Sequence, residues 1–179
     1  MKKLFLTLVL ALMPALFFGQ TAFDKYDGQE GVTSVIISKK MFEMMSNIKT
    51  DLKDKEAQQY LNLIKKLENL KVFVTSNPKV TSDMKLTSSK YLKSASLEEL
   101  MRINDQGKNI KIYVKSGNSS SKVKELLMFI EGGTAKDDTV LMSLKGDFDL
   151  NELSVLTDKM NLPGGDALKK GTKGSKGAK

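Results

Sequence analysis

Apolar and polar positions divide the region after residue 30 into a strand followed by two helices. Residues 32–38 (VTSVIIS) are rich in β-branched side chains, which predicts a buried first strand. A helix is predicted next, because Met41, Phe42, Met44, Met45 and Ile48 form one apolar stripe. After a polar break at 49–55, apolar residues recur every three or four positions, which predicts an amphipathic helix: Ala57, Tyr60, Leu61, Ile64, Leu67 and Leu70.

A second strand and further helices are predicted before residue 105. Residues 71–76 (KVFVTS) have the composition of a strand, and Asn77-Pro78 forms a turn that can begin a helix over 79–95. Residues 96–99 (SLEE) match a capping box in front of Leu100, Met101 and Ile103. This pattern predicts that another helix starts at that point.

The second half of the chain has the pattern of three successive antiparallel strands and a last helix. Residues 110–115 alternate between apolar and polar side chains, and 117–121 (GNSSS) is a turn. Residues 123–130 and 139–144 are predicted strands on either side of Gly132-Gly133, although 123–130 (VKELLMFI) also has helical propensity. A final helix is predicted from Leu150 to about Met160, ended by residues 161–165 (NLPGG).

This order of elements predicts an α/β (α+β) fold. Strands joined through helices lie parallel by the crossover rule, whereas the meander adds antiparallel strands to the same sheet. We therefore expect a two-layer sandwich with a mixed sheet of about five strands and helices mainly on one face.

The first residues have the pattern of an export signal. Lys2 and Lys3 precede an apolar run over 4–18, which contains Pro14 and is shorter than a membrane-spanning helix. We expect a signal peptide at 1–20, a single globular domain at 21–162, and a periplasmic or secreted protein. An uncleaved membrane anchor is the alternative interpretation.

The net charge of +8 does not indicate nucleic-acid binding. The leader and the Lys/Gly-rich segment 163–179 hold seven of the 29 basic residues and one of the 21 acidic residues, which leaves 22 against 20. Residues 163–179 are expected to be a disordered tail, whose lysines could weakly contact an anionic membrane surface.

The composition excludes several classes of chemistry. The chain has no His, Cys or Trp, so catalysis by Ser-His-Asp or Cys-His, thiol redox exchange, disulfides, and metal sites built on imidazole or thiolate are all absent. No cofactor is expected.

Several stretches resemble a family of exported proteins of Bacteroidota known as domain of unknown function family 4252. They are residues 23–26 (FDKY), 31–45 (GVTSVIISKKMFEMM), 99–112 (ELMRINDQGKNIKI), 125–128 (ELLM) and 144–150 (LKGDFDL). The resemblance implies an export signal followed by one domain of this kind. It implies no activity, cofactor or catalytic residue.

Two patterns could bind metals, but each has a structural interpretation that we favour. Asp147, Asp149 and Asn151 have the spacing that opens a calcium loop, yet Glu152 stands where that loop needs Gly. We expect Asp149 and Glu152 to cap the last helix instead. Met41, Met44 and Met45 could offer thioethers to Cu(I), but we expect them to pack in the core.

No spacing selects a catalytic pair among the residues suited to acid or base catalysis. The candidates are Glu43, Glu98, Glu99, Asp105, Tyr60, Tyr91 and Tyr113. Residues 119–121 (SSS) with Lys122 could form only a Ser-Lys dyad without a supporting motif. Arg102, the single Arg in the chain, is expected to pair with Glu98 or Glu99.

The favoured function is therefore a non-catalytic module that binds an envelope protein or surface component through an exposed sheet face or edge strand. The alternative is a carboxylate-dependent hydrolase that acts on a glycan. No catalytic, cofactor-binding or metal-binding residue is assigned. Metal storage or transport is a third possibility.

Overall fold

A computed structural model describes residues 22–47, 55–105, 107–119, 121–132 and 137–152. The predicted signal peptide, the tail and the greater part of the predicted last helix lie outside the described residues. The described elements follow one another along the chain as η2 (Asp24–Tyr26), β1 (Thr33–Ser38), α2 (Lys39–Ser46), α3 (Lys55–Ile64), β2 (Leu67–Thr75), α4 (Pro78–Ala95), β3 (Glu98–Asp105), β4 (Lys108–Ser116), β5 (Lys122–Glu131), β6 (Thr139–Asp149) and η3 (Leu150–Glu152).

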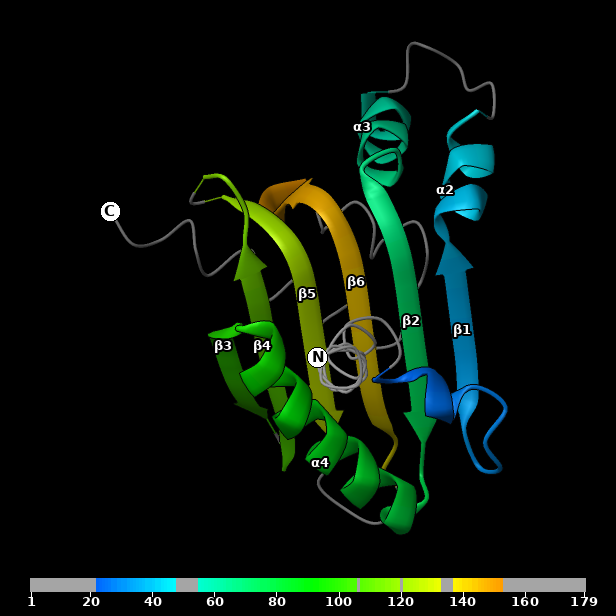
Figure 1. Ribbon diagram of the computed structural model, residues 1–179, viewed down its shortest axis with the longest axis vertical. Coiled ribbons are helices and arrows are strands. Elements are labelled where there is room, and N and C mark those ends of the chain that lie inside the picture. Colours follow the sequence, from blue (N-terminus) through cyan, green and yellow to red (C-terminus); the bar gives the residue numbers. More distant parts are fainter. Residues whose placement is uncertain (1–21, 48–54, 106, 120, 133–136, 153–179) are drawn as a thin grey trace, which may run out of the picture.

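The strands form one open sheet in the order β1-β2-β6-β5-β4-β3, and every neighbouring pair is antiparallel (Figure 1). The α+β class is thereby confirmed. The six strands of the described sheet agree with the expectation of about five, but the expected mixed sheet is wrong, because every described pair is antiparallel. Helices α2 and α3 pack side by side beyond the end of β1 (Figure 1). The chain therefore enters β2 at the same end of the sheet at which it left β1, so the two strands are antiparallel and the crossover rule for parallel strands does not apply.

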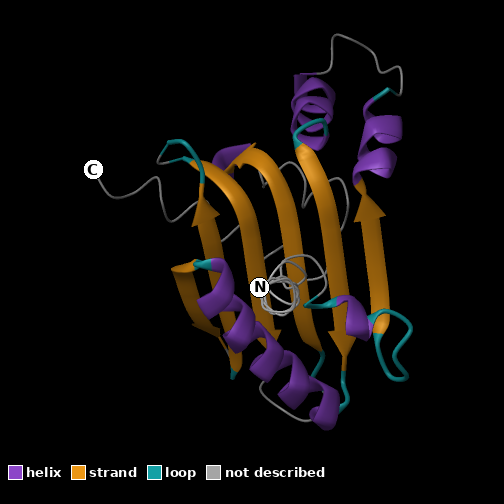
Figure 2. Ribbon diagram, in the orientation of Figure 1, coloured by secondary structure: helices purple, strands orange, loops and turns teal. Residues whose placement is uncertain are grey.

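Side chains alternate between the two faces of the sheet, and each face has its own apolar cluster. Helix α4 crosses one face diagonally, and we call this the α4 face (Figure 2). Its cluster joins the helix and the segment around η2 to β2, β5 and β6: Phe23, Tyr26, Phe73, Val80, Met84, Tyr91, Leu127, Phe129 and Leu141.

The cluster on the opposite face is larger and includes Phe42 of α2 with Leu63 and Ile64 of α3. From the sheet it takes residues such as Val72, Ile112 and Met142. The expectation of helices mainly on one face is therefore wrong: α4 packs on one face, and the apolar residues of α2 and α3 join the cluster of the other.

Helix α4 confirms the prediction for 79–95, with its cap at Asn77. The Asn77 side-chain Oδ1 accepts a hydrogen bond from the Lys79 amide at 3.0 Å, and Pro78 stands at the first helical position, where its missing N–H costs no hydrogen bond. The helix ends at Ser96, whose left-handed backbone (φ 55°) turns the chain toward β3.

One predicted helix is a strand in the structure, and a second one is a helix only in its first part. The helix predicted to begin at residues 96–99 is the edge strand β3, and the helix predicted over 57–70 ends at Ile64, so that Leu67 and Leu70 belong to β2. The predicted strands at 32–38, 71–76, 110–115, 123–130 and 139–144 are confirmed, most of them a few residues longer than expected.

Candidate functional site

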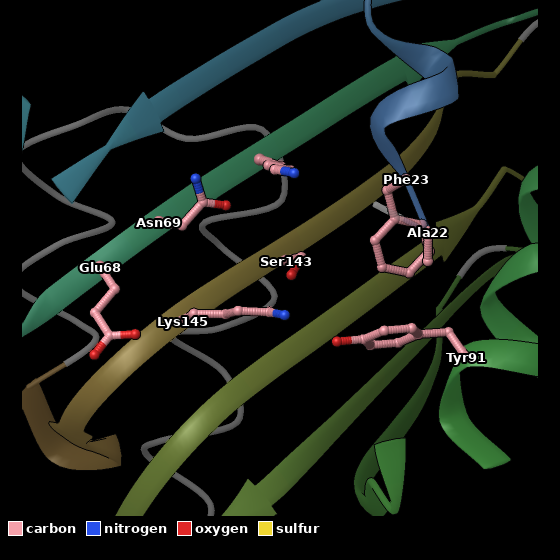
Figure 3. Close-up of a pocket in the computed structure, with 8 residues that line it drawn as sticks. Ala22, Phe23, Glu68, Asn69, Tyr91, Ser143 and Lys145 are labelled. Atoms are coloured by element: carbon pink, nitrogen blue, oxygen red, sulfur yellow. The ribbon is translucent and has the colours of Figure 1, made fainter. Parts of the chain in front are cut away.

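A polar pocket of about 250 Å³ opens on the α4 face, over neighbouring parts of β2 and β6 (Figure 3). Its walls are Phe23 and Tyr91, whose rings lie 4.9 Å apart between centroids. The rest of the lining comes from Ala22 and from two neighbouring strands: Glu68, Asn69 and Lys71 of β2, with Ser143 and Lys145 of β6.

Tyr91, Glu125 and Lys145 form a connected group at this pocket. The Tyr91 hydroxyl donates a hydrogen bond of 2.7 Å to Oε1 of Glu125, whose side chain is buried. The Lys145 ammonium lies 3.8 Å from the same oxygen and 5.6 Å from the centroid of the Tyr91 ring. In Figure 3 the ends of Lys145 and Tyr91 point toward one another. A buried carboxylate thus has both a neutral donor and a nearby cation.

The environment of Tyr91 favours its neutral form. Burial raises the pKa of the Tyr91 hydroxyl, and the hydrogen bond and charge of Glu125 raise this pKa further. Tyr91 therefore remains a hydrogen-bond donor at neutral pH and is unsuited to act as a base.

The remaining polar residues of the pocket differ in their partners. Lys71 is paired with Asp24 of η2, and the Asn69 amide donates to the Ile37 carbonyl at 3.4 Å. Ser143 is buried and lines the pocket. The charges of the pocket are therefore largely paired.

The candidate acids and bases from the sequence are dispersed. Glu43 lies on α2, beside one edge strand, and Glu98 and Glu99 lie on β3 at the other edge of the sheet. Tyr60, Tyr91 and Tyr113 lie on α3, α4 and β4, and the side chain of Asp105 is not among those described. Of the candidates whose side chains are described, Tyr91 alone lines the pocket.

Sequence reasoning missed Glu125, the carboxylate at the pocket. The signal was present, because Glu125, Leu127 and Phe129 share one face of β5 and the other two are core residues. A carboxylate at the start of an otherwise apolar face is costly to bury alone.

The capping interpretation of the Asp149 region is confirmed at Glu152, whose Oε2 accepts a hydrogen bond from the Asp149 amide at 3.2 Å. The Asp147 carboxylate is paired with Lys124 at 2.7 Å, and the side chain of Asn151 is not among those described. Within the described ranges, no group of three or more acidic residues is arranged to hold a metal ion.

Two sequence expectations about side-chain partners have clear outcomes. Arg102 does pair with Glu99, at 2.7 Å, although both lie on a strand and not on a helix. The turn at 117–121 is confirmed by the hydrogen bond of 2.7 Å from the Gly117 amide to the Lys122 carbonyl, so Lys122 serves the turn and the strand that follows it.

The edge strand β1 and helix α2 carry four exposed apolar residues, which we call the β1–α2 edge: Val35 (44% exposed), Ile36 (42%), Met41 (49%) and Met44 (59%). The expectation that Met41 and Met44 pack in the core is wrong. On this short helix Phe42 and Met45, three positions apart, face the core, so the neighbouring methionines face outward.

The two edges of the sheet differ in protection. Strand β1 has no charged residue over Thr33–Ser38, no proline, and no irregularity in its pairing with β2. Strand β3 has Glu98, Glu99 and Arg102, and an irregularity at Leu100, an exposed apolar residue. Charges and bulges block strand pairing at a sheet edge, so β3 is protected and β1 is open.

These features define an α+β domain with an open antiparallel sheet, a polar pocket on the α4 face and one unprotected edge. The chain belongs to the family described as Domain of unknown function (DUF4252), whose model matches residues 26–156. No curated protein and no solved structure matches the chain. In the part of the chain that the structure describes, no helix has the length and apolar character needed to span a membrane.

Proposed function

We propose that this protein is an exported, non-catalytic interaction module that binds an extended protein segment along β1. The observation that supports this function is the contrast between the two sheet edges. The outer backbone groups of β1 offer hydrogen bonds to a further strand, and Val35 and Ile36 offer apolar contacts on the two faces of that strand. The partner strand is expected to be uncharged and rich in β-branched residues.

Site-specific photocrosslinking in the cells that make the protein tests this function. A photoreactive residue replaces Val35 in one variant and Leu100 in the control, since both are exposed apolar residues on edge strands. We expect a crosslinked protein adduct from position 35 and none from position 100. Absence of an adduct at 35, or adducts only at 100, would contradict the proposal.

Export is supported by the order of Lys2, Lys3 and the apolar run at 4–18. N-terminal sequencing of the protein from the envelope or secreted fraction tests it. The expected result is a chain that begins close to residue 21, whereas an intact N-terminus on protein from the cytosol would contradict export.

The alternative function, a carboxylate-dependent hydrolase acting on a glycan, would use the pocket. Glu68 lines it, and Glu125 contacts the lining residues Tyr91 and Lys145; one strand, β6, lies between the strands of the two carboxylates. That places the two strands about 10 Å apart, at the upper limit for a pair of glycosidase carboxylates. Glycan hydrolysis that is lost in Glu125→Gln, while the variant stays folded, would favour this alternative over the interaction module.

A further inference from the structure

We propose that the strand that pairs with β1 is β1 of a second copy of this chain, in antiparallel orientation about a two-fold axis. This inference rests on the proposed function and names its partner. It starts from the charges at the ends of β1. Asp27 and Glu30 are exposed before the strand, and Lys39 and Lys40 are exposed directly after it.

This arrangement is self-complementary only when two copies run antiparallel. The acidic end of each strand then meets the basic end of the other, whereas a parallel arrangement would place like charges together. Within the described ranges, neither Glu30 nor Lys39 takes part in an ion pair. Both ends of the strand therefore keep a charge available for a second copy.

The register follows from the faces of the sheet. A two-fold axis perpendicular to the sheet keeps paired side chains on the same face, so a residue at the axis lies opposite its own copy. We place Val35 at this axis, because that register brings Glu30 level with the helix start that bears Lys39 and Lys40. The uncharged residues Thr33–Ile37 then pair among themselves, and the two six-stranded sheets become one continuous sheet.

The first test is the mass of the exported protein in solution over a range of concentrations, measured by light scattering or sedimentation. We expect one copy at low and two copies at high concentration. Val35→Lys is expected to keep the protein monomeric, because it sets two ammonium groups opposite each other at the axis. The control Leu100→Lys, on the other edge strand, is expected to dimerise normally. A wild-type protein that stays monomeric, or a dimer that Val35→Lys leaves unchanged, would overturn the inference.

The second test uses charge exchange between two variants. Glu30→Lys alone, and Lys39→Glu with Lys40→Glu alone, each place like charges at both ends of the dimer and are expected to weaken it at least tenfold. A mixture of the two variants restores opposite charges at both ends, so it is expected to assemble as strongly as the natural protein. A mixture no stronger than its components would contradict the antiparallel arrangement.

A third test fixes the register, using the fact that the chain has no Cys. Two Val35 residues at the axis would have Cα atoms about 5 Å apart, within the range of a disulfide. Oxidised Val35→Cys is expected to form a covalent dimer, and Leu100→Cys is not. If the photocrosslinked adduct from position 35 contains a different protein, the inference fails and the proposed function stands; if there is no adduct, both fail.

Discussion

The buried pair of Tyr91 and Glu125 shows how one residue contact links the pocket to stability. Glu125 is 6% exposed and accepts the Tyr91 hydrogen bond. We predict that Tyr91→Phe lowers the free energy of unfolding by about 1–3 kcal/mol, because a buried carboxylate loses a donor. Tyr60→Phe is the control: its hydroxyl has no hydrogen-bond partner among the described residues, so a change below about 0.5 kcal/mol is expected. Urea unfolding measures both, and equal losses would contradict the role of the pair.

The tyrosines also predict the behaviour at high pH. Burial raises the pKa of Tyr26 and Tyr91 well above the ordinary value of 10.0. The folded chain therefore keeps protons that the unfolded chain releases near pH 10, and the stability from these groups is present below that pH and lost as pH rises above it. The chain has four Tyr and no Trp, so absorbance at 295 nm follows their ionisation cleanly.

We expect this absorbance to rise in two stages, with Tyr26 and Tyr91 ionising only as the circular dichroism of the fold is lost. A single stage near pH 10 in protein that remains folded would show that neither side chain is held in its neutral form. Tyr91→Phe is expected to reduce the amplitude of the later stage by about half.

At the residue scale, the sequence predicted which nearby side chains pair with each other better than it predicted where those side chains lie in the fold. The pairing of Arg102 with an adjacent acid and the bond from Asp149 to Glu152 both followed from short spacings. Glu125 was missed because its partners Tyr91 and Lys145 are 34 and 20 positions away, and only the packing of α4 on the sheet brings them together.

At the scale of elements, both segments that were predicted as helices but form strands contain a β-bulge. An extra residue between Leu67 and Asn69 in the pairing with β6 shifts the alternation, so that Leu67 and Leu70 point to the same face at a spacing of three. In β3 an extra residue lies at Leu100, and the apolar residues Leu100, Met101 and Ile103 directly follow the capping-box sequence at 96–99. Single-sequence periodicity cannot separate a bulged strand from a helix of this length.

The first of these bulges also depends on Gly146. A Cβ added there would lie 2.4 Å from the Lys66 carbonyl oxygen and 2.9 Å from the Leu67 Cα, and these are backbone atoms that cannot turn aside. We predict that Gly146→Ala lowers the free energy of unfolding by about 3 kcal/mol.

The matched control is Gly28→Ala. Gly28 has open space around it but a positive φ of 73°, so only a backbone cost of about 1 kcal/mol is expected. Chemical denaturation compares the two variants. If Gly28→Ala were as destabilising as Gly146→Ala, the close approach of the backbone at Lys66 and Leu67 would not be the reason that position 146 requires glycine.

At the scale of the whole molecule, the sequence predicted the α+β class and the succession of strands but not the topology of the sheet. The antiparallel pairing of β1 with β2 depends on how α2 and α3 pack between them. No local sequence pattern in 39–64 predicts that the chain reverses its direction there. For the same reason, the sequence predicted that an exposed sheet face or edge strand would bind a partner but did not say which strand. The structure identifies which strands are the edges, and their sequences then distinguish the charged β3 from the uncharged β1.

This difference between edges leads to a prediction for hydrogen exchange of the backbone amides. Among the described strands of a single copy, none pairs with the outward-facing amides of β1. We therefore expect these amides to exchange rapidly in dilute protein and to slow down when β1 of a second copy accepts their hydrogen bonds. Raising the protein concentration should therefore slow exchange in peptides that cover β1, while peptides that cover β3 stay unchanged. In Val35→Lys the concentration dependence should disappear from β1 as well. Slower exchange in β3 alone, or equally in both edges, would assign the association to a different surface.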